Sequence, residues 1–214
     1  MLALFDLDNT LIDRQRGLEA WAQRFAHTRA LPPSAPLVIV ERLRDRAYPA
    51  DLGEVGAVLG LGDSAEDLWR EYVEGMAQAA RRFPGVVNGL RELQRAGWTL
   101  GVATNGAVDI QRAKLSSAGL APLFHGVCVS QEAGARKPAR RFFEAAAAQC
   151  GTDLSAGGWM IGDNPETDIE GGRAAGLRTM WVAAGRQWPT GVHSPDVVVA
   201  DVAEATAVLS VLAL

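Results

Sequence analysis

The apolar residues of the chain fall into short runs separated by longer amphipathic stretches. The first run, 2–5, stops abruptly at Asp6, as expected of a strand that is buried on both faces. Similar runs follow at 99–103, 126–129, 158–161, 179–182 and 197–199, and helical periodicity is found near 86–96, 107–118, 139–150, 166–175 and 201–212. This alternation predicts an α/β fold with a doubly wound, mainly parallel sheet and helices on both faces.

Residues 14–83 interrupt the alternation. Only 37–40 could form a strand there, and the rest shows helical spacing of apolar residues, for example at Leu18, Trp21 and Phe25. We therefore predict a core of residues 1–13 and 84–214 with an inserted α-helical domain, residues 14–83. Such an insert lies over the carboxyl end of the first strand, where open α/β sheets bind ligands.

The composition excludes several classes of protein. With 48% hydrophobic residues and a net charge of −4, the 214 residues can bury a sizeable core and are not expected to be disordered. No apolar run reaches the roughly 18 residues of a membrane span. The 25 acidic residues outnumber the 21 basic ones, which argues against a nucleic-acid polymer as partner. Two cysteines and a start without a signal-peptide pattern favour the cytoplasm.

The basic residues are almost all arginine. Lys114 and Lys137 are the exceptions, and a lysine can mark a place where a compact ammonium group is needed instead of a planar guanidinium. Lys137 precedes Pro138, which we expect in the first turn of the helix 139–150. Lys114 lies on the helix 107–118 with no motif around it. We therefore expect Lys137→Arg to be much more damaging than Lys114→Arg.

Polar side chains follow the ends of the predicted strands. Asp6 and Asp8 come directly after the first strand, and residues two apart in an extended segment point the same way, so both carboxylates can face one ligand. Two negative charges that close need a cation, a shared proton or solvent, and their oxygens suit Mg²⁺. Thr104, Asn105 and Gly106 follow the next strand, where a hydroxyl, a carboxamide and a helix N-terminus can bind a phosphate.

A second acidic pair follows the run 158–161. Asp163 lies at the strand end and Asp168 about one turn into the next helix, which Asn164 can cap. Each of these features alone has an ordinary structural explanation. Because the carboxyl ends of parallel strands share one edge of a sheet, we expect both acidic pairs, the threonine and Lys137 to meet there. The sequence thus predicts one site, built for a metal-bound phosphate.

At these residues the chain resembles the haloacid dehalogenase-like (HAD) hydrolase superfamily. The resemblance is carried by Asp6-x-Asp8-x-Thr10, Thr104, Lys137-Pro138 and Gly162-Asp163-x-x-x-x-Asp168. It extends over the whole chain, because the helical insert looks like the C1 cap of that family. The resemblance implies the family's sheet order 5-4-1-2-3, a Mg²⁺ cofactor and an aspartyl-phosphate intermediate.

The resemblance also implies a role for each matching residue. Asp6 is the expected nucleophile, and Asp8 is the acid that protonates the leaving oxygen and then the base that activates water. The expected Mg²⁺ ligands are Asp6, the main-chain carbonyl of Asp8, and Asp163, with Asp168 behind them. The expected phosphate ligands are Thr104, Asn105 and Lys137, and the lysine also neutralises developing charge.

Asp8 distinguishes between activities within the family. The dehalogenases proper lack this second acid, because a halide leaves without a proton, so Asp8 favours a phosphatase for a small phosphomonoester. The loops around Asp6 and Thr104 look most like those of nucleoside-monophosphate and acylneuraminate-phosphate phosphatases. The substrate expected is therefore a small phosphorylated metabolite such as a nucleoside monophosphate or a sugar phosphate, and the protein a monomer or homodimer.

Several alternatives have different sequence requirements. A phosphomutase of the β-phosphoglucomutase type would use the same residues and stays open. A phospho-aspartate signalling domain would place its phosphorylated aspartate at the end of a later strand, and no isolated aspartate follows 99–103 or 126–129. A non-catalytic binding protein should have lost the acidic pair or Lys137. A phosphonatase would want a lysine within 14–83, which contains none.

Arginines are common in the insert. Some could face an anionic substrate, but most are expected on solvated helix faces; the set includes Arg14, Arg16, Arg24, Arg42, Arg44 and Arg46. Arg186, Trp188 and His193 follow the fifth strand; they could reach the rim of the site, but we expect them on a plain surface loop.

Overall fold

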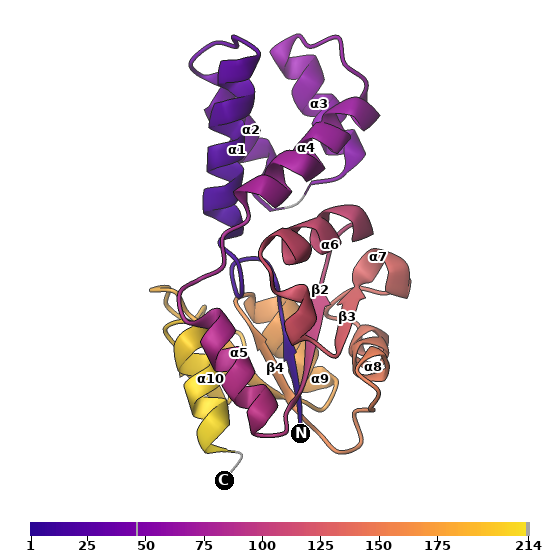
Figure 1. The fold of residues 1–214 in the computed structure, drawn as a ribbon, viewed down its shortest axis with the longest axis vertical. Helices are drawn as coiled ribbons and strands as arrows, with labels where there is room; N and C mark the ends of the chain where they lie inside the picture. Colours follow the sequence, from indigo (N-terminus) through magenta and orange to yellow (C-terminus); the bar gives the residue numbers. More distant parts are fainter. Residues whose placement is uncertain (46, 213–214) are drawn as a thin grey trace.

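A six-stranded sheet with helices on both faces carries a group of four further helices at one end (Figure 1). The structure, a computed structural model, describes residues 1–45 and 47–212. The first strand runs upward in Figure 1 from the N-terminus toward the four helices, which therefore stand over the carboxyl edge of the sheet. No helix within the described ranges is long and apolar enough to cross a membrane.

All strand pairs in the sheet are parallel. The strands are β1 (Leu2–Phe5), β2 (Thr99–Thr104), β3 (Gly126–Val129), β4 (Trp159–Gly162), β5 (Arg178–Val182) and β6 (Val197–Val199). Their spatial order is β3-β2-β1-β4-β5-β6. The order 5-4-1-2-3 expected from the resemblance is confirmed, and β6 extends the sheet beyond β5. The predicted α/β fold is likewise confirmed.

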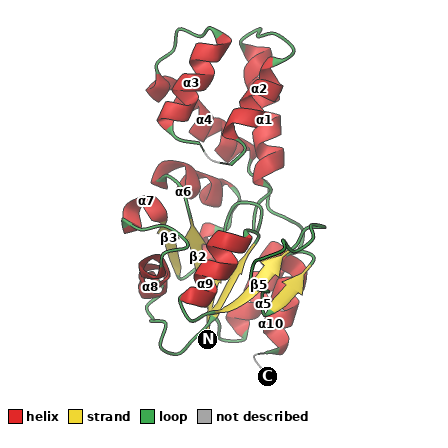
Figure 2. Cartoon of the chain, turned by 180° about the vertical axis from the view of Figure 1, so that it is seen from behind, coloured by secondary structure: helices red, strands yellow, loops and turns green. Residues whose placement is uncertain are grey.

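Two layers of helices cover the sheet, as Figures 1 and 2 show from opposite sides. One face packs against α5 (Val86–Arg95) and α10 (Val202–Val211), and the other against α8 (Arg140–Gln149) and α9 (Gly171–Ala174). In β1, Ala3 and Phe5 belong to the first hydrophobic cluster, whereas Leu2 and Leu4 belong to the second. This strand is apolar at every position because both of its faces are buried.

The remaining described helices of the core lie in the connections between the strands. They are α6 (Val108–Ser117), α7 (Ser130–Ala133), the single turn η1 (Ala121–Leu123) and the π-helical turn η2 (Pro165–Glu170). The predicted helix 166–175 is thus divided into η2 and α9. Pro138 was expected inside the first turn of α8, and this is wrong: α8 begins at Arg140 with Ala139 as N-cap.

The four helices above the sheet, called the helical unit below, are α1 (Arg14–Thr28), α2 (Ala35–Leu43), α3 (Pro49–Leu59) and α4 (Ala65–Ala79). They have their own hydrophobic cluster, which includes Trp21 and Tyr72. The expectation that 37–40 could form a strand is wrong. These residues lie in α2, because Ile39 and Leu43, one helical turn apart, are both fully buried against the other helices, and this packing overrides the strand preference of the Val-Ile-Val run.

Two neighbouring chain segments connect the helical unit with the core. Ile12 bridges antiparallel to Arg82, the N–H of Asp13 donates to the carbonyl of Arg81 (2.9 Å), and the N–H of Phe83 donates to that of Leu11 (3.1 Å). The division of the chain into 1–13, 14–83 and 84–214 stays a prediction.

The helical unit also packs on α6. Ala107 and Ile110 belong to the cluster of the helical unit, and Trp69 Nε1 of α4 donates to Asp109 Oδ2 at 2.6 Å. One face of α6 therefore serves as the surface on which α4 rests.

Candidate active site

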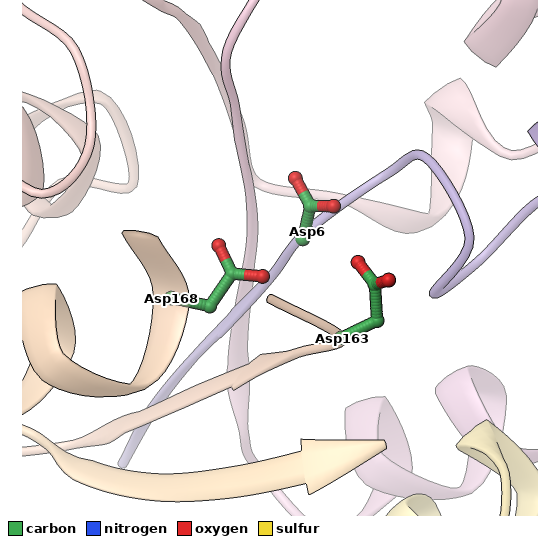
Figure 3. A group of neighbouring side chains, drawn as sticks. All are labelled: Asp6, Asp163 and Asp168. Atoms are coloured by element: carbon green, nitrogen blue, oxygen red, sulfur yellow. The ribbon is translucent and has the colours of Figure 1, made fainter. Parts of the chain in front are cut away.

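Three aspartates converge at the carboxyl edge of the sheet (Figure 3). Asp6 follows β1, Asp163 follows β4, and Asp168 lies in η2. One carboxylate oxygen from each lies within 4.8 Å of the other two. The strand order reverses between β1 and β4, and open α/β sheets bind ligands at such a point. The structure thus brings together three of the residues that the sequence predicted for one site.

Lys137 reaches into this acidic group from the segment before α8. Its Nζ lies 2.6 Å from Asp6 Oδ1 and 2.7 Å from Asp168 Oδ1, and the residue is buried. The carboxamide of Asn105 fixes the Lys137 backbone, because it accepts a hydrogen bond from the N–H (2.9 Å) and donates one to the carbonyl (3.1 Å). The Asn105 side chain is therefore used to place Lys137, and only the main chain around it is left to meet a phosphate.

Asp168 is fully buried, and both of its carboxylate oxygens are bonded. Oδ1 pairs with Lys137, and Oδ2 accepts a hydrogen bond from the N–H of Asn164 at 3.0 Å. Asn164 is also the N-cap of η2, because its Oδ1 accepts hydrogen bonds from the first free backbone N–H groups of this helical turn. A Cβ at Gly162 would lie only 2.2 Å from Asp168 Oδ2, so glycine at the end of β4 leaves the space for this carboxylate. Both oxygens of Asp168 are thus bonded within the protein, and the role of this residue behind a metal ion stays a prediction.

Without a bound cation, burial and mutual repulsion disfavour the ionised forms of Asp6 and Asp163. Burial raises the pKa of Asp6 to about 8; Lys137 opposes this, while Asp168 and Asp163 add to it. Burial also raises the pKa of Asp163 to about 6, again with a contribution from Asp168. Burial lowers the pKa of Lys137, but Asp168 and Asp6 outweigh it and raise that pKa above its usual value. Converging oxygens that repel one another in this way fit a hard divalent cation such as Mg²⁺.

Asp8 is held by a separate set of cations. Both of its carboxylate oxygens lie 2.6 Å from Lys114 Nζ, and Arg14 Nε lies 3.9 Å from Oδ2. Burial alone would raise the pKa of Asp8, but Lys114 and Arg14 outweigh burial, and the pKa lies below its ordinary value. The interpretation of Lys114 as a lysine outside the site is therefore wrong.

Gln111 connects Asp8 with Thr104. Its Nε2 donates to Asp8 Oδ2 (3.2 Å), to Thr104 Oγ1 (2.5 Å) and to the carbonyl of Asn105 (3.1 Å). Thr104 is buried at the end of β2 and keeps its own O–H to donate to a ligand. Sequence reasoning missed Gln111 as well as Lys114. The available signal was their helical phase, because Ile110, Gln111, Lys114 and Leu115 are the buried residues of α6 and two of the four are polar.

Two cavities meet at Asp8. The larger, about 420 Å³, lies over the acidic group, and the smaller, about 80 Å³, lies beneath the helical unit. Residues that line both are Asp8, Arg14, Asp45, Asn105 and Arg136. Tyr48, Tyr72 and Ile110 line only the smaller one. Asp8 therefore forms part of the wall between the cavity over the acidic group and a smaller compartment with aromatic sides.

The arginines of the helical unit divide into two groups. Arg14 and Arg44 line the larger cavity, and the Arg14 guanidinium is held by the carbonyls of Leu43 (2.7 Å) and Arg44. Arg24 and Arg42 instead bond within the helical unit, to the carbonyl of Gly75 and to Glu54. The Arg16 backbone N–H is bonded to Asp13. Arg46 lies outside the described residues.

Arg186 lies on the exposed loop after β5, as expected, but it also reaches the rim of the site, which was the second alternative. Its guanidinium lies 3.2 Å from Asp163 Oδ2 and donates to the Asp163 carbonyl at 2.9 Å. Trp188 packs on Trp181 with ring centroids 4.9 Å apart, and His193 lies 3.2 Å from Glu170, so these two are surface contacts beside the site. The position of Arg186 after β5 was the only sequence signal for its contact with Asp163.

The fold is a parallel α/β sheet, and Asp6, Lys137 and Asp168 form a buried ion-paired group where the strand order reverses. A further aspartate, Asp8, pairs with Lys114 beside this group. Together the fold and these ion pairs indicate the class of protein to which the chain belongs. Residues 3–182 match the sequence family described as haloacid dehalogenase-like hydrolase, and the chain belongs to this family. The order β3-β2-β1-β4-β5-β6 differs from the 2-1-3-4-5 order of receiver-type folds, which argues against the signalling-domain alternative.

Similar proteins include named phosphatases. The chain is 37% identical over 164 residues to phosphoserine phosphatase of Thermus thermophilus, covering 75% of this chain and 63% of that enzyme. It is 34% identical over 188 residues to phosphoglycolate phosphatase of Caulobacter vibrioides, covering 85% and 78%. The chain thus spans less than two thirds of the Thermus enzyme. Among solved structures, the magnesium-bound HAD-hydrolase YfnB of Bacillus subtilis has the same fold, with a TM-score of 0.78, 23% identity and 97% coverage of both chains.

Proposed function

We propose that the protein is a Mg²⁺-dependent phosphatase that hydrolyses a small phosphomonoester through an aspartyl-phosphate on Asp6. The observation that carries this proposal is the pairing of two aspartates with two different lysines: Asp6 with Lys137 in the acidic group, and Asp8 with Lys114 at the junction of the cavities. In this proposal the Asp6 carboxylate accepts the phosphoryl group, and the Asp8 carboxyl serves the leaving oxygen and then the attacking water. The naming of the relatives as phosphatases supports the same chemistry.

Residues of this chain fit a magnesium ion. We assign it to the carboxylates of Asp6 and Asp163 and to the main-chain carbonyl of Asp8, because the two oxygens of Asp168 are already bonded to Lys137 and Asn164. When bound, Mg²⁺ supplies positive charge that favours the ionised carboxylates and the charge of the transferring phosphoryl group.

The proposed reaction has two steps. In the first, a carboxylate oxygen of Asp6 forms a bond to phosphorus, the ester P–O bond breaks, and Asp8 gives its proton to the leaving oxygen. In the second, Asp8 takes a proton from water, the water oxygen bonds to phosphorus, and the bond to Asp6 breaks to release phosphate. A substrate phosphate beside Asp8 raises the pKa of that carboxyl and so favours the proton that the first step needs.

Lys137 and Thr104 hold the phosphate in both steps. The Lys137 ammonium, already 2.6 Å from Asp6, lies next to the expected phosphoryl oxygens and stabilises the charge that develops on them. The O–H of Thr104 and the main chain at Asn105 donate to the same group. Placement by the Asn105 carboxamide keeps Lys137 fixed during the reaction.

The shape of the site supports a small substrate. The larger cavity of about 420 Å³ accommodates the phosphate end, and the leaving group extends past Asp8 toward the compartment with Tyr48 and Tyr72. We propose a nucleoside monophosphate or a sugar phosphate, because these aromatic side chains can pack against a base or a sugar ring. Both cysteines are free thiols, which supports the cytoplasm as the compartment.

Release of inorganic phosphate tests the proposal. We expect Mg²⁺-dependent hydrolysis of p-nitrophenyl phosphate and of members of a panel of phosphorylated metabolites, loss of turnover in Asp6→Asn, and wild-type turnover in the isosteric control Asp153→Asn, whose side chain is exposed in a turn. Full activity in Asp6→Asn would exclude the nucleophile assignment. Exchange between phosphosugar isomers without net phosphate release would favour the phosphomutase.

A further inference from the structure

Two buried polar residues on α6 have no part in the reaction as written above. Gln111 and Lys114 are each 2% exposed and lie three positions apart, so their side chains share one face of the helix. A lysine is almost never buried to this degree without a partner. The partners of Gln111 and Lys114 therefore indicate what this face of α6 does.

Both residues bind the side chain of Asp8. Lys114 Nζ contacts the two carboxylate oxygens at equal distances of 2.6 Å, and Gln111 Nε2 adds a third contact to Oδ2 at 3.2 Å. Three contacts to two oxygens fix both the position and the rotation of a carboxylate. No other ion pair of Lys114 is present in the described part of the chain.

Lys114 and Gln111 lie behind Asp8 as seen from the acidic group. Both line the smaller cavity, and neither is among the described residues that line the larger one. Asp8 lines both. Neither residue is therefore placed to contact the phosphate directly. Lys114 is placed to act through Asp8, and Gln111 is placed to act through Asp8 and also through Thr104, whose Oγ1 accepts from Gln111 Nε2 at 2.5 Å.

Neighbouring positions on the same helix explain how α6 is held. Ala107 and Ile110 pack into the cluster of the helical unit, and Asp109 accepts the hydrogen bond from Trp69. The helix that carries Gln111 and Lys114 is thus anchored on α4. Side chains on an anchored helix hold a partner more precisely than side chains on a loop.

We propose that Gln111 and Lys114 are positioning residues that hold the Asp8 carboxylate at the junction of the two cavities, facing the leaving oxygen and then the attacking water. The inference rests on the proposed function, because it assumes that Asp8 is the acid and base. It gives each of the two reacting aspartates its own lysine: Lys137, which also pairs with Asp168, serves the nucleophile, and Lys114 serves the proton-transfer group.

Rapid-mixing kinetics with p-nitrophenyl phosphate and Mg²⁺ separate the two steps. Nitrophenolate leaves without a proton, so forming the aspartyl-phosphate needs Asp6 but not the proton of Asp8, whereas hydrolysis of the intermediate needs Asp8 as base. We expect Lys114→Met and Asp8→Asn to keep an initial burst of about one nitrophenolate per site and to lower the steady-state rate by about 10-fold or more. The double variant should be no slower than Asp8→Asn, because Lys114 acts only through Asp8.

Three further variants complete the test. Arg112→Met removes an exposed cation from the same helix, paired with Glu132 on the outer surface, and should match the wild type. Lys114→Gln should also keep the burst and slow the steady state, and it replaces Lys114→Met if that variant shows no cooperative thermal unfolding.

Gln111→Met should slow the steady state and also the burst, because it removes the contacts of Gln111 with both Asp8 and Thr104. Loss of burst and steady state together in a Lys114 variant, or an effect of that variant that multiplies with that of Asp8→Asn, would overturn the inference while leaving the function intact. Activity in Asp6→Asn would instead overturn the function itself.

Discussion

Gly162→Ala tests whether the position of Asp168 in the acidic group is fixed, because the added methyl group would overlap the Asp168 carboxylate. Gly162 ends β4, and its backbone is not in the left-handed region, so alanine is allowed there by backbone geometry. The added Cβ would lie 2.2 Å from Asp168 Oδ2 and 2.4 Å from its Cγ. Asp168 cannot retreat without breaking its bond to Lys137 or to the N–H of Asn164.

The expected cost follows from these contacts. Overpacking in a well-packed interior costs about 1–3 kcal/mol, and loss of one hydrogen bond to a charged group costs about 1.5–3 kcal/mol. Because the two overlap, we expect about 3 kcal/mol, which corresponds to a fall in Tm of about 6–12 °C for a chain of this size. Turnover should fall as well, because Lys137 loses the partner that aligns it with Asp6.

Thermal unfolding and phosphate release from p-nitrophenyl phosphate measure the two effects. Gly62→Ala is the matched control, since a Cβ there meets no atom within 4 Å and the position lies between α3 and α4. A Gly162→Ala protein with the Tm and kcat of the control would refute the view that Asp168 is fixed by its two bonds.

Three further predictions follow from the site. Lys114→Arg and Lys137→Arg should both lower kcat by about 10-fold or more, because neither buried ammonium leaves room for a guanidinium fork; wild-type kcat in Lys114→Arg alone would restore the sequence-based expectation. In chelator-treated protein, Tm should fall as pH rises from about 4 to about 8, because native Asp6 and Asp163, with pKa values raised to about 8 and about 6, hold protons that the unfolded chain releases. Added Mg²⁺ should raise Tm more near the upper end of that range, where protons compete least, and a pH-independent Tm would contradict this. Asn105→Ala should lower stability by about 1–3 kcal/mol in urea unfolding and lower kcat, since both bonds to the Lys137 backbone are lost, whereas Asn88→Ala on the exposed face of α5 should change neither.

The residues at the strand ends were predictable because a parallel sheet gathers those ends at one edge. The order of an apolar run followed by Asp6, and of another followed by Asp163, is enough to place both carboxylates there. The α2 helix was harder, because the Val-Ile-Val run has strand preference and only the packing of Ile39 against other helices decides its structure.

Contacts between distant segments were not predictable from the pattern. Lys114 meets Asp8 across 106 positions, and Arg186 meets Asp163 through a loop with no regular spacing. Periodicity predicts which side of a helix is buried, but it does not predict which residue of another segment contacts that side. For Lys114, the phase of α6 predicted burial, and the identity of its partner required the fold.

The paired segments 11–13 and 81–83 determine which parts of the chain can be altered without disturbing the sheet. The chain leaves the sheet at Ile12 and returns at Arg82 through neighbouring, hydrogen-bonded backbones. The helices between them can therefore be lengthened or shortened while β1 and Asp6 stay in place, as long as Arg14 still meets Asp8 and α4 still packs on α6. Replacement by a different set of helices would alter the compartment beside Tyr48 and Tyr72 while Asp6 and Lys137 stay in register. A change confined to these helices would thus test how far the compartment beside the proposed phosphoryl-transfer centre selects the substrate.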